Sequence, residues 1–446
     1  MGDGGPMTEL SGWGRFPVAR GTERVSEDLE SATAGAALSR GLGRSYGDAS
    51  LPAAAGEVVA ASRRADRLLA FDPETGVLRA EAGLSLRELN RIFLRRGYAS
   101  PVSPGTQYVT LGGMVASDVH GGNHHVAGTF GEHVRSLRMR VADGRVLEVS
   151  ERSEPELFRA TLGGMGLTGH ILEVEFALER ISSAWIYQES RRVRDLDDLV
   201  ETLLDASRKW PFTKCWFDST KRGPTMGRGI SIVGRWAQPG EAPAEPPVLH
   251  QNLSVPFDLP LGLVNGLTVP VFNTFWFHKH GRGLRSGIVH PQACFWPLDD
   301  VRHWNRLYGP RGFAQYQCVL PIERDTRVVR RFFAAMTRRG CPSPVSVIKD
   351  CGAEGKGMIS FPKPGISIAV DVPLRGARTQ ALVDALNEIV LEAGGRIYLS
   401  KDSLTRPEHF RAMEPRLAGW NEVRRKWDPE RRLRSALSVR LLGDDA

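Results

Sequence analysis

The stretch GLGRSYGD at residues 41–48 combines three glycines with an arginine, a tyrosine and an aspartate. A Pro-containing segment, ASLPAAAGEVVAAS (49–62), follows it, so no helix is expected directly after the glycines. A P-loop needs that helix and is therefore excluded. The N–H groups of a glycine-rich turn can bind phosphate oxygens, and Arg44 would add positive charge. The alternative is a surface turn with an Arg–Asp ion pair.

A second glycine-rich stretch is SPGTQYVTLGGMVASDVHGGNHHVAGTFG (103–131), which has almost no charged side chains. His120 and His124 have the spacing of a helical zinc pair, but the glycines between them disfavour a helix and no HExxH glutamate is present. We therefore expect no metal. Small residues let backbone N–H groups approach a planar, phosphate-bearing cofactor. The alternative is a purely structural glycine-rich loop.

A third stretch, GGMGLTG (163–169), contains G-x-G-x-x-G at Gly164, Gly166 and Gly169. A dinucleotide fingerprint requires a strand before the glycines and a helix after them. Here a helix is predicted before them and a strand after them, so a Rossmann NAD site is excluded.

The composition is that of a globular protein of two or three domains: 446 residues, 41% hydrophobic and 25% charged. We expect neither a membrane-spanning helix nor a signal peptide, and reduced cysteines point to the cytoplasm. The net charge of +8 favours an anionic partner: a phosphorylated cofactor, an anionic lipid surface or nucleic acid. No nucleic-acid-binding motif accompanies the basic residues, so no nucleic-acid partner is predicted.

Local patterns predict several elements in the first third of the chain. Residues 68–83 and 138–150 predict hairpins with turns at Gly76 and at Asp143–Gly144. A helix is expected to begin after a Ser85 cap and to end at Gly97. A short helix in SEPELFRATL (153–162) is expected to have a capping box from Ser153 to Glu156.

Near residue 185 the pattern changes to amphipathic helices interleaved with strands. Helices are predicted within 195–210, 325–340 and 378–395, and strands at 229–236, 315–321, 344–351 and 366–373. The irregular alternation predicts an α+β fold, with an antiparallel sheet and flanking helices in this second part. Residues 237–270 are Pro-rich and aperiodic, which predicts a mobile loop.

Several of these strands carry polar residues on one face. Gln315 and Gln317 share a face, as do Ser367, Ala369 and Asp371, and Lys349 is in phase with the valines of its own strand. A lysine on such a face is costly unless it meets an anion, although a strand-end lysine can also extend to solvent. Together these strands predict the floor of a polar pocket.

Taken in order, these stretches resemble the vanillyl-alcohol-oxidase (PCMH-type) superfamily of FAD enzymes, and within it the flavoprotein subunits of the decaprenylphosphoryl-β-D-ribose 2′-epimerase family. The resemblance runs nearly end to end. It also includes SGWGRFP (11–17), KCWFDS (214–219), HWNRLYGPRGFAQYQCVLP (303–321), ISFPKPGISIAVDVP (359–373) and GGRIYLSKDS (394–403).

The resemblance implies an FAD-binding domain of residues 1–184 and 396–446 and a substrate domain of residues 185–395. Some superfamily members attach FAD to a histidine of the first loop, whereas this loop carries Arg44, so we expect non-covalent FAD. The implied cofactor-binding residues are Gly41, Gly43, Arg44, Ser45, Tyr46, Gly47, Thr106, Gly112, Gly113, Ser117, His120, Gly121, Gly164, Gly169, Tyr398 and Lys401.

The implied reaction is oxidation of a sugar hydroxyl to a ketone with hydride transfer to flavin N5, after which a separate NADH-dependent short-chain reductase completes an epimerisation. Lys401, Tyr46 and His120 are the candidate catalytic residues; a cation near the flavin would stabilise its reduced form. The sequence does not identify the general base. The candidate substrate-binding residues are Lys349, Gln317, Tyr308, Trp216, Ala369 and Ser367.

Three positions depart from the resembling sequences: Ala369 stands in place of a pocket cysteine, Gly122 in place of a lysine, and Trp296 in place of a histidine. The departures leave open a paralogous oxidase or dehydrogenase acting on another sugar, a nucleoside or an alditol. A basic lipid- or nucleic-acid-binding protein with a degenerate flavin fold is the alternative from another class. If the substrate is a polyprenyl-phosphosugar, residues 237–270 could guide its lipid at a membrane surface as a peripheral contact.

Overall fold

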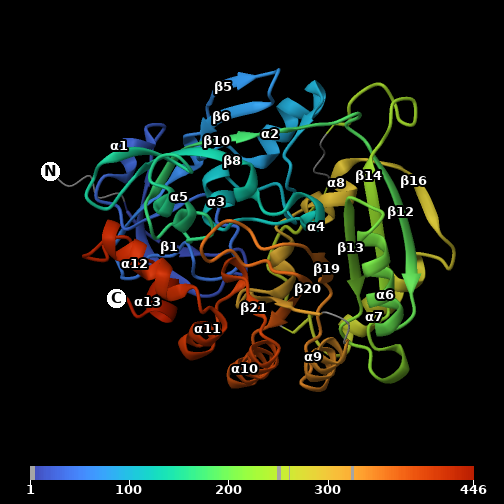
Figure 1. The fold of residues 1–446 in the computed structure, drawn as a ribbon. Helices are drawn as coiled ribbons and strands as arrows, with labels where there is room; N and C mark the ends of the chain where they lie inside the picture. The colour runs from blue at the N-terminus through green and yellow to red at the C-terminus, as the bar shows by residue number, and fades with distance from the viewer. Residues whose placement is uncertain (1–5, 249–252, 261, 323–325, 446) are drawn as a thin grey trace.

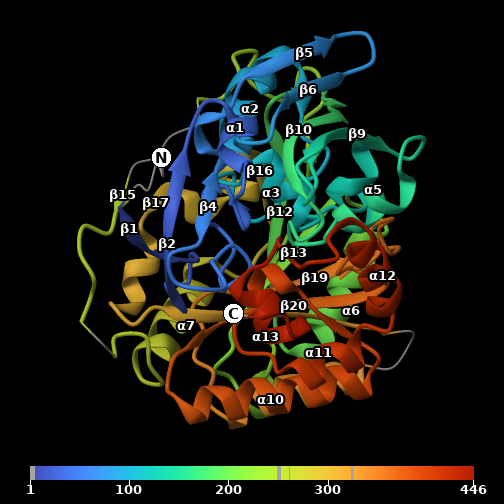
Figure 2. The same cartoon turned by 90° about the vertical axis from the view of Figure 1, so that its left-hand side faces the viewer.

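The computed structural model describes residues 6–248, 253–260, 262–322 and 326–445. Among the described residues, those up to 177 form two sheets and five α-helices, and those from 186 to 397 form one large sheet (Figure 1). The last helices then return to the first part, where α12 (Leu417–Trp427) packs on α5 (Pro155–Thr161). Figure 2 shows these C-terminal helices beside the N-terminal strands. The architecture is α+β, as the sequence predicts.

The first sheet has four strands in the order β1-β2-β4-β3, and β4 pairs in parallel with both of its neighbours. The edge strand β3 leads directly into the glycine-rich stretch 41–48. The strands are β1 (Met7–Ser11), β2 (Val18–Val25), β3 (Leu38–Arg40) and β4 (Val58–Ala61).

The second sheet is antiparallel, with the order β5-β6-β10-β8-β9. Both predicted hairpins belong to it and are confirmed as the pairs β5·β6 and β8·β9. Gly76 and Gly144 have the positive φ angles that their turns require, +72° and +94°. The strands are β5 (Leu68–Asp72), β6 (Val77–Glu81), β8 (Val134–Arg140), β9 (Val146–Ser150) and β10 (His170–Ala177).

The third sheet has eight antiparallel strands in the order β16-β12-β14-β13-β19-β20-β18-β21. Its strand β21 comes from the start of the C-terminal segment, so this sheet also includes residues 396 and 397. The strands are β12 (Ile186–Val193), β13 (Phe212–Phe217), β14 (Gly229–Trp236), β16 (Arg285–Val289), β18 (Phe313–Leu320), β19 (Ser346–Cys351), β20 (Gly365–Pro373) and β21 (Arg396–Ile397).

Helices cover one face of this large sheet. The even-numbered residues of β20 pack against them in the main core, while its odd-numbered residues face the other way, as the alternation predicts. The three predicted helices of this part are confirmed as α6 (Leu196–Ser207), α9 (Arg327–Arg338) and α10 (Ala377–Glu392). Two short two-stranded pairs join β7 (Tyr98–Ala99) to β11 (Glu179–Arg180) and β15 (Leu253–Ser254) to β17 (Val301–Arg302).

Of the two helix starts predicted from cap residues, one is confirmed and one is wrong. Ser85 accepts a hydrogen bond from the Glu88 N–H at the start of α2 (Leu86–Phe93), as predicted. The capping box from Ser153 is wrong: Pro155 takes the first helical position of α5, so Glu154 becomes the cap, with φ +55° and no side-chain bond. The remaining helices are α1 (Leu29–Thr33), α3 (Leu111–Ala116), α4 (His124–Ala127), α7 (Thr268–Lys279), α8 (Pro291–Phe295), α11 (Pro407–Met413) and α13 (Ala436–Leu442).

The stretch 237–270 is placed in large part, and the part of the predicted mobile loop at 249–252 and 261 lies outside the described residues. Residues 253–260 run beside residues 302–306. The Val255 N–H donates a hydrogen bond to the Arg302 carbonyl, and the Leu259 N–H donates one to the Arg306 carbonyl. Asp258 forms an ion pair with Arg15. This stretch therefore spans from the third sheet to the N-terminal segment.

Candidate active site

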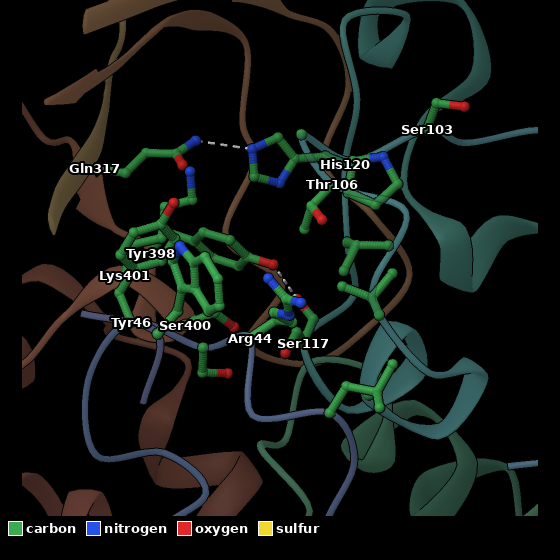
Figure 3. A pocket seen from close by; sticks show the side chains of 18 of the residues that line it. Arg44, Tyr46, Ser103, Thr106, Ser117, His120, Gln317, Tyr398, Ser400 and Lys401 are labelled. Carbon is green, nitrogen blue, oxygen red and sulfur yellow. Dashed lines mark hydrogen bonds between the residues drawn. The ribbon is translucent and has the colours of Figure 1, made fainter. Parts of the chain in front are cut away.

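One pocket joins the glycine-rich loops of the first part to the face of the large sheet that carries Gln317 and Lys349. Figure 3 shows its labelled side chains converging from four separate segments of the chain. Tyr46 and Arg44 come from the loop after β3, and His120 from the loop after α3. Gln317 comes from β18 and Lys401 from the short 3₁₀ helix η7 (Leu399–Lys401).

The stretch 41–48 lies against the C-terminal segment. The Tyr46 N–H donates to the Ser400 carbonyl at 2.8 Å, and a Cβ on Gly47 would lie 1.8 Å from the Asp402 carbonyl oxygen, so only glycine permits this approach. Asp48 accepts two hydrogen bonds from Arg440, which also pairs with Asp402 at 2.9 Å. The loop is therefore fixed by a residue of helix α13 that lies 392 positions later in the sequence.

Arg44 is held between two aromatic rings, 3.9 Å from the centroid of Trp13 and 4.8 Å from that of Tyr108. Its Nε is buried without a hydrogen-bond partner among the described residues. Burial lowers the pKa of this guanidinium, and Asp299 opposes that shift. Arg44 thus presents an unsatisfied donor to the pocket, where an anionic ligand would satisfy it.

His120 is buried at the centre of the pocket and lies within hydrogen-bond distance of Gln317, 2.8 Å between the two Nε2 atoms (Figure 3). Burial, and then repulsion by Lys349, hold its pKa well below the usual range, so the imidazole is neutral. With Gln317 donating, Nε2 accepts and the ring proton lies on Nδ1, which has no partner among the described residues. His124 and His125 are engaged elsewhere, with the Gly352 N–H and the Trp210 carbonyl.

Lys401 lies 5.4 Å from the centroid of the Tyr46 ring. Burial, and then repulsion by Lys349, lower the pKa of Lys401 to about 7, although Asp371 partly opposes both effects. Asp371 accepts hydrogen bonds from Tyr308 at 2.7 Å and Gln315 at 2.5 Å, and burial raises its pKa to about 6. Near neutral pH, Lys401 can therefore both hold and release a proton.

The pocket-facing side of the large sheet is the polar floor that the sequence predicts. Gln317 is opposite Ala369, which is opposite Val347, so one row crosses β18, β20 and β19. The next row sets Ser367 opposite Lys349. The lining residues on this face are Gln315, Gln317, Val345, Val347, Lys349 and Ala369, joined by Lys214 and Ile232 from β13 and β14.

Most of the predicted site residues line this one pocket. They are Gly41, Gly43, Arg44, Ser45, Tyr46, Thr106, Gly112, Gly113, Ser117, His120, Gly169, Gln317, Lys349, Ala369, Tyr398 and Lys401. Six others lie outside its lining: Gly47, Gly121, Gly164, Trp216, Tyr308 and Ser367.

The six have packing or supporting contacts instead. Gly47, Gly121 and Gly164 permit close backbone approach, since a Cβ would lie 1.8, 2.5 and 2.2 Å from carbonyl oxygens. The Trp216 indole donates to the Pro344 carbonyl. Tyr308 contacts Asp371, and Ser367 accepts from Gln317. Tyr308 and Ser367 thus act on the pocket through a neighbour.

Sequence reasoning missed Lys214 as a lining residue. The alternation in FTKCWF (212–217) puts it on the same face as Trp216, so the signal was present. Asp299 was also missed; it accepts from Thr106 and from the Gln107 N–H, and no local pattern marks it.

Comparisons with known proteins agree with this geometry. Residues 23–150 match the model of an FAD binding domain. The chain is 34% identical, over 97% of both chains, to decaprenylphosphoryl-β-D-ribose oxidase of Mycolicibacterium smegmatis. The chain belongs to the decaprenylphosphoryl-β-D-ribose oxidase family. A match at 33% identity covers 80% of this chain and all of an uncharacterised protein of Streptomyces coelicolor. A match at 26% identity covers 38% of this chain and 34% of a D-arabinono-1,4-lactone oxidase of Yarrowia lipolytica.

A member of this family is an FAD-dependent oxidoreductase acting on CH–OH groups. The pocket fits FAD: glycines at 41, 43, 112 and 113 line it, and Arg44 and His120 each present a buried, unpartnered polar nitrogen. The glycine loops and Arg44 would hold the pyrophosphate, and Lys401 and Tyr398 would lie at the reacting end. When bound, the flavin supplies a hydride acceptor.

Proposed function

We propose that the protein oxidises a secondary hydroxyl of a sugar to a ketone, in a reaction most like the 2′-oxidation of decaprenylphosphoryl-ribose. The observation that carries this proposal is the single pocket that brings Lys401, Gln317 and Lys349 together at the end of a glycine-lined groove. We propose residues 1–184 with 396–446 as the FAD-binding domain and 185–395 as the substrate domain.

Each group at the reacting end has a distinct part in this proposal. Gln317, fixed by His120 and Ser367, orients a substrate hydroxyl. Lys401 receives the hydroxyl proton as hydride leaves carbon, because its pKa of about 7 leaves a large fraction unprotonated at neutral pH. Once protonated, it places a positive charge beside the reduced cofactor. Tyr46, beneath Lys401, limits the access of water.

A second candidate is an oxidase of a different sugar, nucleoside or alditol. Ala369 and Gly122 both line the pocket and are the positions where side chains of the resembling sequences are missing. These two changes at the pocket wall favour a substrate of another shape.

Anaerobic flavin reduction tests these two alternatives. Polyprenyl-phosphoribose analogues, free pentoses, nucleosides and alditols are mixed in turn with the enzyme, and loss of flavin absorbance is followed. The proposal expects the phosphoribose analogues to reduce the flavin fastest, and reoxidation to be faster with a quinone or dye than with oxygen. Faster reduction by a nucleoside or alditol, with stoichiometric peroxide, refutes it in favour of the oxidase.

We also propose that the flavin is held non-covalently, because residues 41–48 contain no histidine and Arg44 occupies this loop. Acid precipitation should release all flavin into the supernatant. Flavin that stays with the precipitated protein would contradict this. Because a ketone must be reduced to complete an epimerisation, we propose that an NADH-dependent short-chain reductase consumes the product; a coupled assay with such a reductase should yield the epimer.

Finally, we propose a peripheral membrane contact on the surface formed by residues 253–260 and 262–285. Within the described ranges, no helix is long and apolar enough to span a bilayer. Leu267, just before helix α7, and Val271 and Phe275 within it are nevertheless 81%, 71% and 63% exposed, at the four-residue spacing of one helix face. The neighbouring cations Lys279, Arg282 and Arg285 would meet anionic headgroups.

This surface continues toward the pocket, because Val264 packs in one cluster with Tyr46 and Leu298. A polyprenyl chain could therefore pass from the membrane to the reacting end. Liposomes of phosphatidylglycerol and phosphatidylcholine should sediment the wild type but not a triple variant with Leu267, Val271 and Phe275 changed to Ser. Serine at Val18, Leu69 and Val126, which are also exposed and lie elsewhere on the surface, is the control. Equal sedimentation of both variants would refute the contact.

A further inference from the structure

Two lysines face each other across neighbouring strands at the substrate end of the pocket. Strands β13 and β19 are antiparallel with Cys215 opposite Ile348 and Trp216 opposite Val347. The next position along this register sets Lys214 beside Lys349. Both side chains line the pocket, and Lys214 is also tied to the Cys294 carbonyl by a hydrogen bond from Nζ.

Nothing in the described part of the chain balances these two charges. In the described part of the chain, the groups that act on the Lys349 charge are Cys351 and Lys214, and the group that acts on the Lys214 charge is Cys294, so no carboxylate is among them. Like charges directly opposite each other in an antiparallel pair are destabilising. Burial lowers the pKa of both lysines, and Lys214 lowers that of Lys349 further. A half-buried pair of this kind is stabilised when an anion binds between the two ammonium groups.

The position of the pair indicates which part of a ligand it meets. Val347 lies in the row of Gln317 and Ala369, and Lys349 is two residues further along the same strand, roughly 7 Å away. A pentose whose reacting hydroxyl is near Gln317 can place a phosphate on the neighbouring carbon at that distance.

We propose that Lys214 and Lys349 form a phosphate-binding subsite, and that Lys214 makes the enzyme selective for phosphorylated sugars. The proposal rests on the proposed sugar oxidation for its substrate, but the subsite itself is defined by the two lysines. The ligand is a phosphate ester, so an unphosphorylated glycoside of the same sugar loses this interaction.

Two measurements on the flavin-loaded enzyme test the subsite. The first is calorimetric binding of farnesyl phosphate compared with farnesol. The second is anaerobic flavin reduction by farnesylphosphoryl-β-D-ribose compared with farnesyl β-D-riboside. The variants are Lys214→Met and Lys349→Met, which keep the apolar stem, and Lys209→Met is the matched control, because Lys209 is exposed and lies outside the pocket.

The wild type and Lys209→Met should bind farnesyl phosphate at least about 10-fold more tightly than farnesol, and Lys214→Met should reduce that ratio by about 10-fold. A ratio unchanged in Lys214→Met overturns the proposal. Should Lys214→Met fail to fold, Lys349→Met decides by the same ratio. If no sugar reduces the flavin but the binding ratio depends on Lys214, the proposed function fails and the subsite stands. If both ribosides react equally in wild type and variant, the subsite fails and the function stands.

Discussion

Replacing Lys401 by Met should stabilise the flavin-free protein at neutral pH, although Lys401 is the proposed catalytic lysine. The folded-state pKa of Lys401 is about 7, against an ordinary value of 10.5. The difference is about 3.5 pKa units at about 1.4 kcal/mol each, so the ammonium costs the fold on the order of 5 kcal/mol. Methionine keeps most of the side-chain stem and has no charge to desolvate.

The sign of the pH dependence follows from proton linkage. Between pH 7 and 10.5 the unfolded chain binds more protons at Lys401 than the folded chain does, so wild-type stability rises with pH. The full cost is present below pH 7 and vanishes above 10.5. Between pH 7 and pH 9 the wild type should gain about 2 kcal/mol relative to Lys401→Met. The groups facing Lys401 that share this titration are Lys349, Asp371 and His120.

Urea unfolding of the two flavin-free proteins, followed by tryptophan fluorescence at pH 7 and pH 9, measures this difference. The variant should be more stable at pH 7, with a smaller advantage at pH 9. With FAD bound, the variant should instead show weaker flavin retention and slow flavin reduction. A variant that is less stable than wild type at pH 7, or a difference that does not change with pH, would refute the assignment of a buried, proton-releasing lysine.

Three further outcomes follow from contacts around the pocket. Arg440→Met leaves the buried Asp48 and Asp402 carboxylates without their cation, so it should lower the free energy of unfolding by about 3 kcal/mol in urea titrations. Arg432 is exposed, so the control Arg432→Met should change the free energy of unfolding little. Gly47→Ala places a Cβ where the Asp402 carbonyl oxygen lies and should lower FAD affinity in flavin titrations, whereas Gly56→Ala, which has open space but positive φ, should affect stability alone. Wild type should form no covalent adduct at residue 369 with an electrophilic pocket ligand, while Ala369→Cys should form one by intact mass, and an adduct on wild-type residue 369 would contradict the reasoning.

Much of the site was predictable because alternation along a strand is a local property. The patterns in β18, β19 and β20 placed Gln317, Lys349 and Ala369 on one face, and the structure confirms that they line one pocket. Cap and turn residues likewise placed α2 and both hairpins. Where two local signals compete, sequence reasoning fails, as at Ser153, because Pro155 determines where α5 begins.

The sequence by itself determined helices α2, α5, α6, α9 and α10, the two hairpins of the second sheet and strands β14, β18, β19 and β20. It also determined the face on which β18, β19 and β20 carry their polar residues, and the glycines that let backbone approach a cofactor. Only the tertiary structure decided which residues meet. Loop 41–48 is fixed by Arg440 from the last helix, and Lys214 lies across from Lys349 beside the loop that holds Gly122. These contacts depend on strand order and on the return of the C-terminus. Such long-range pairings are set by burial of the whole core and leave no local signal.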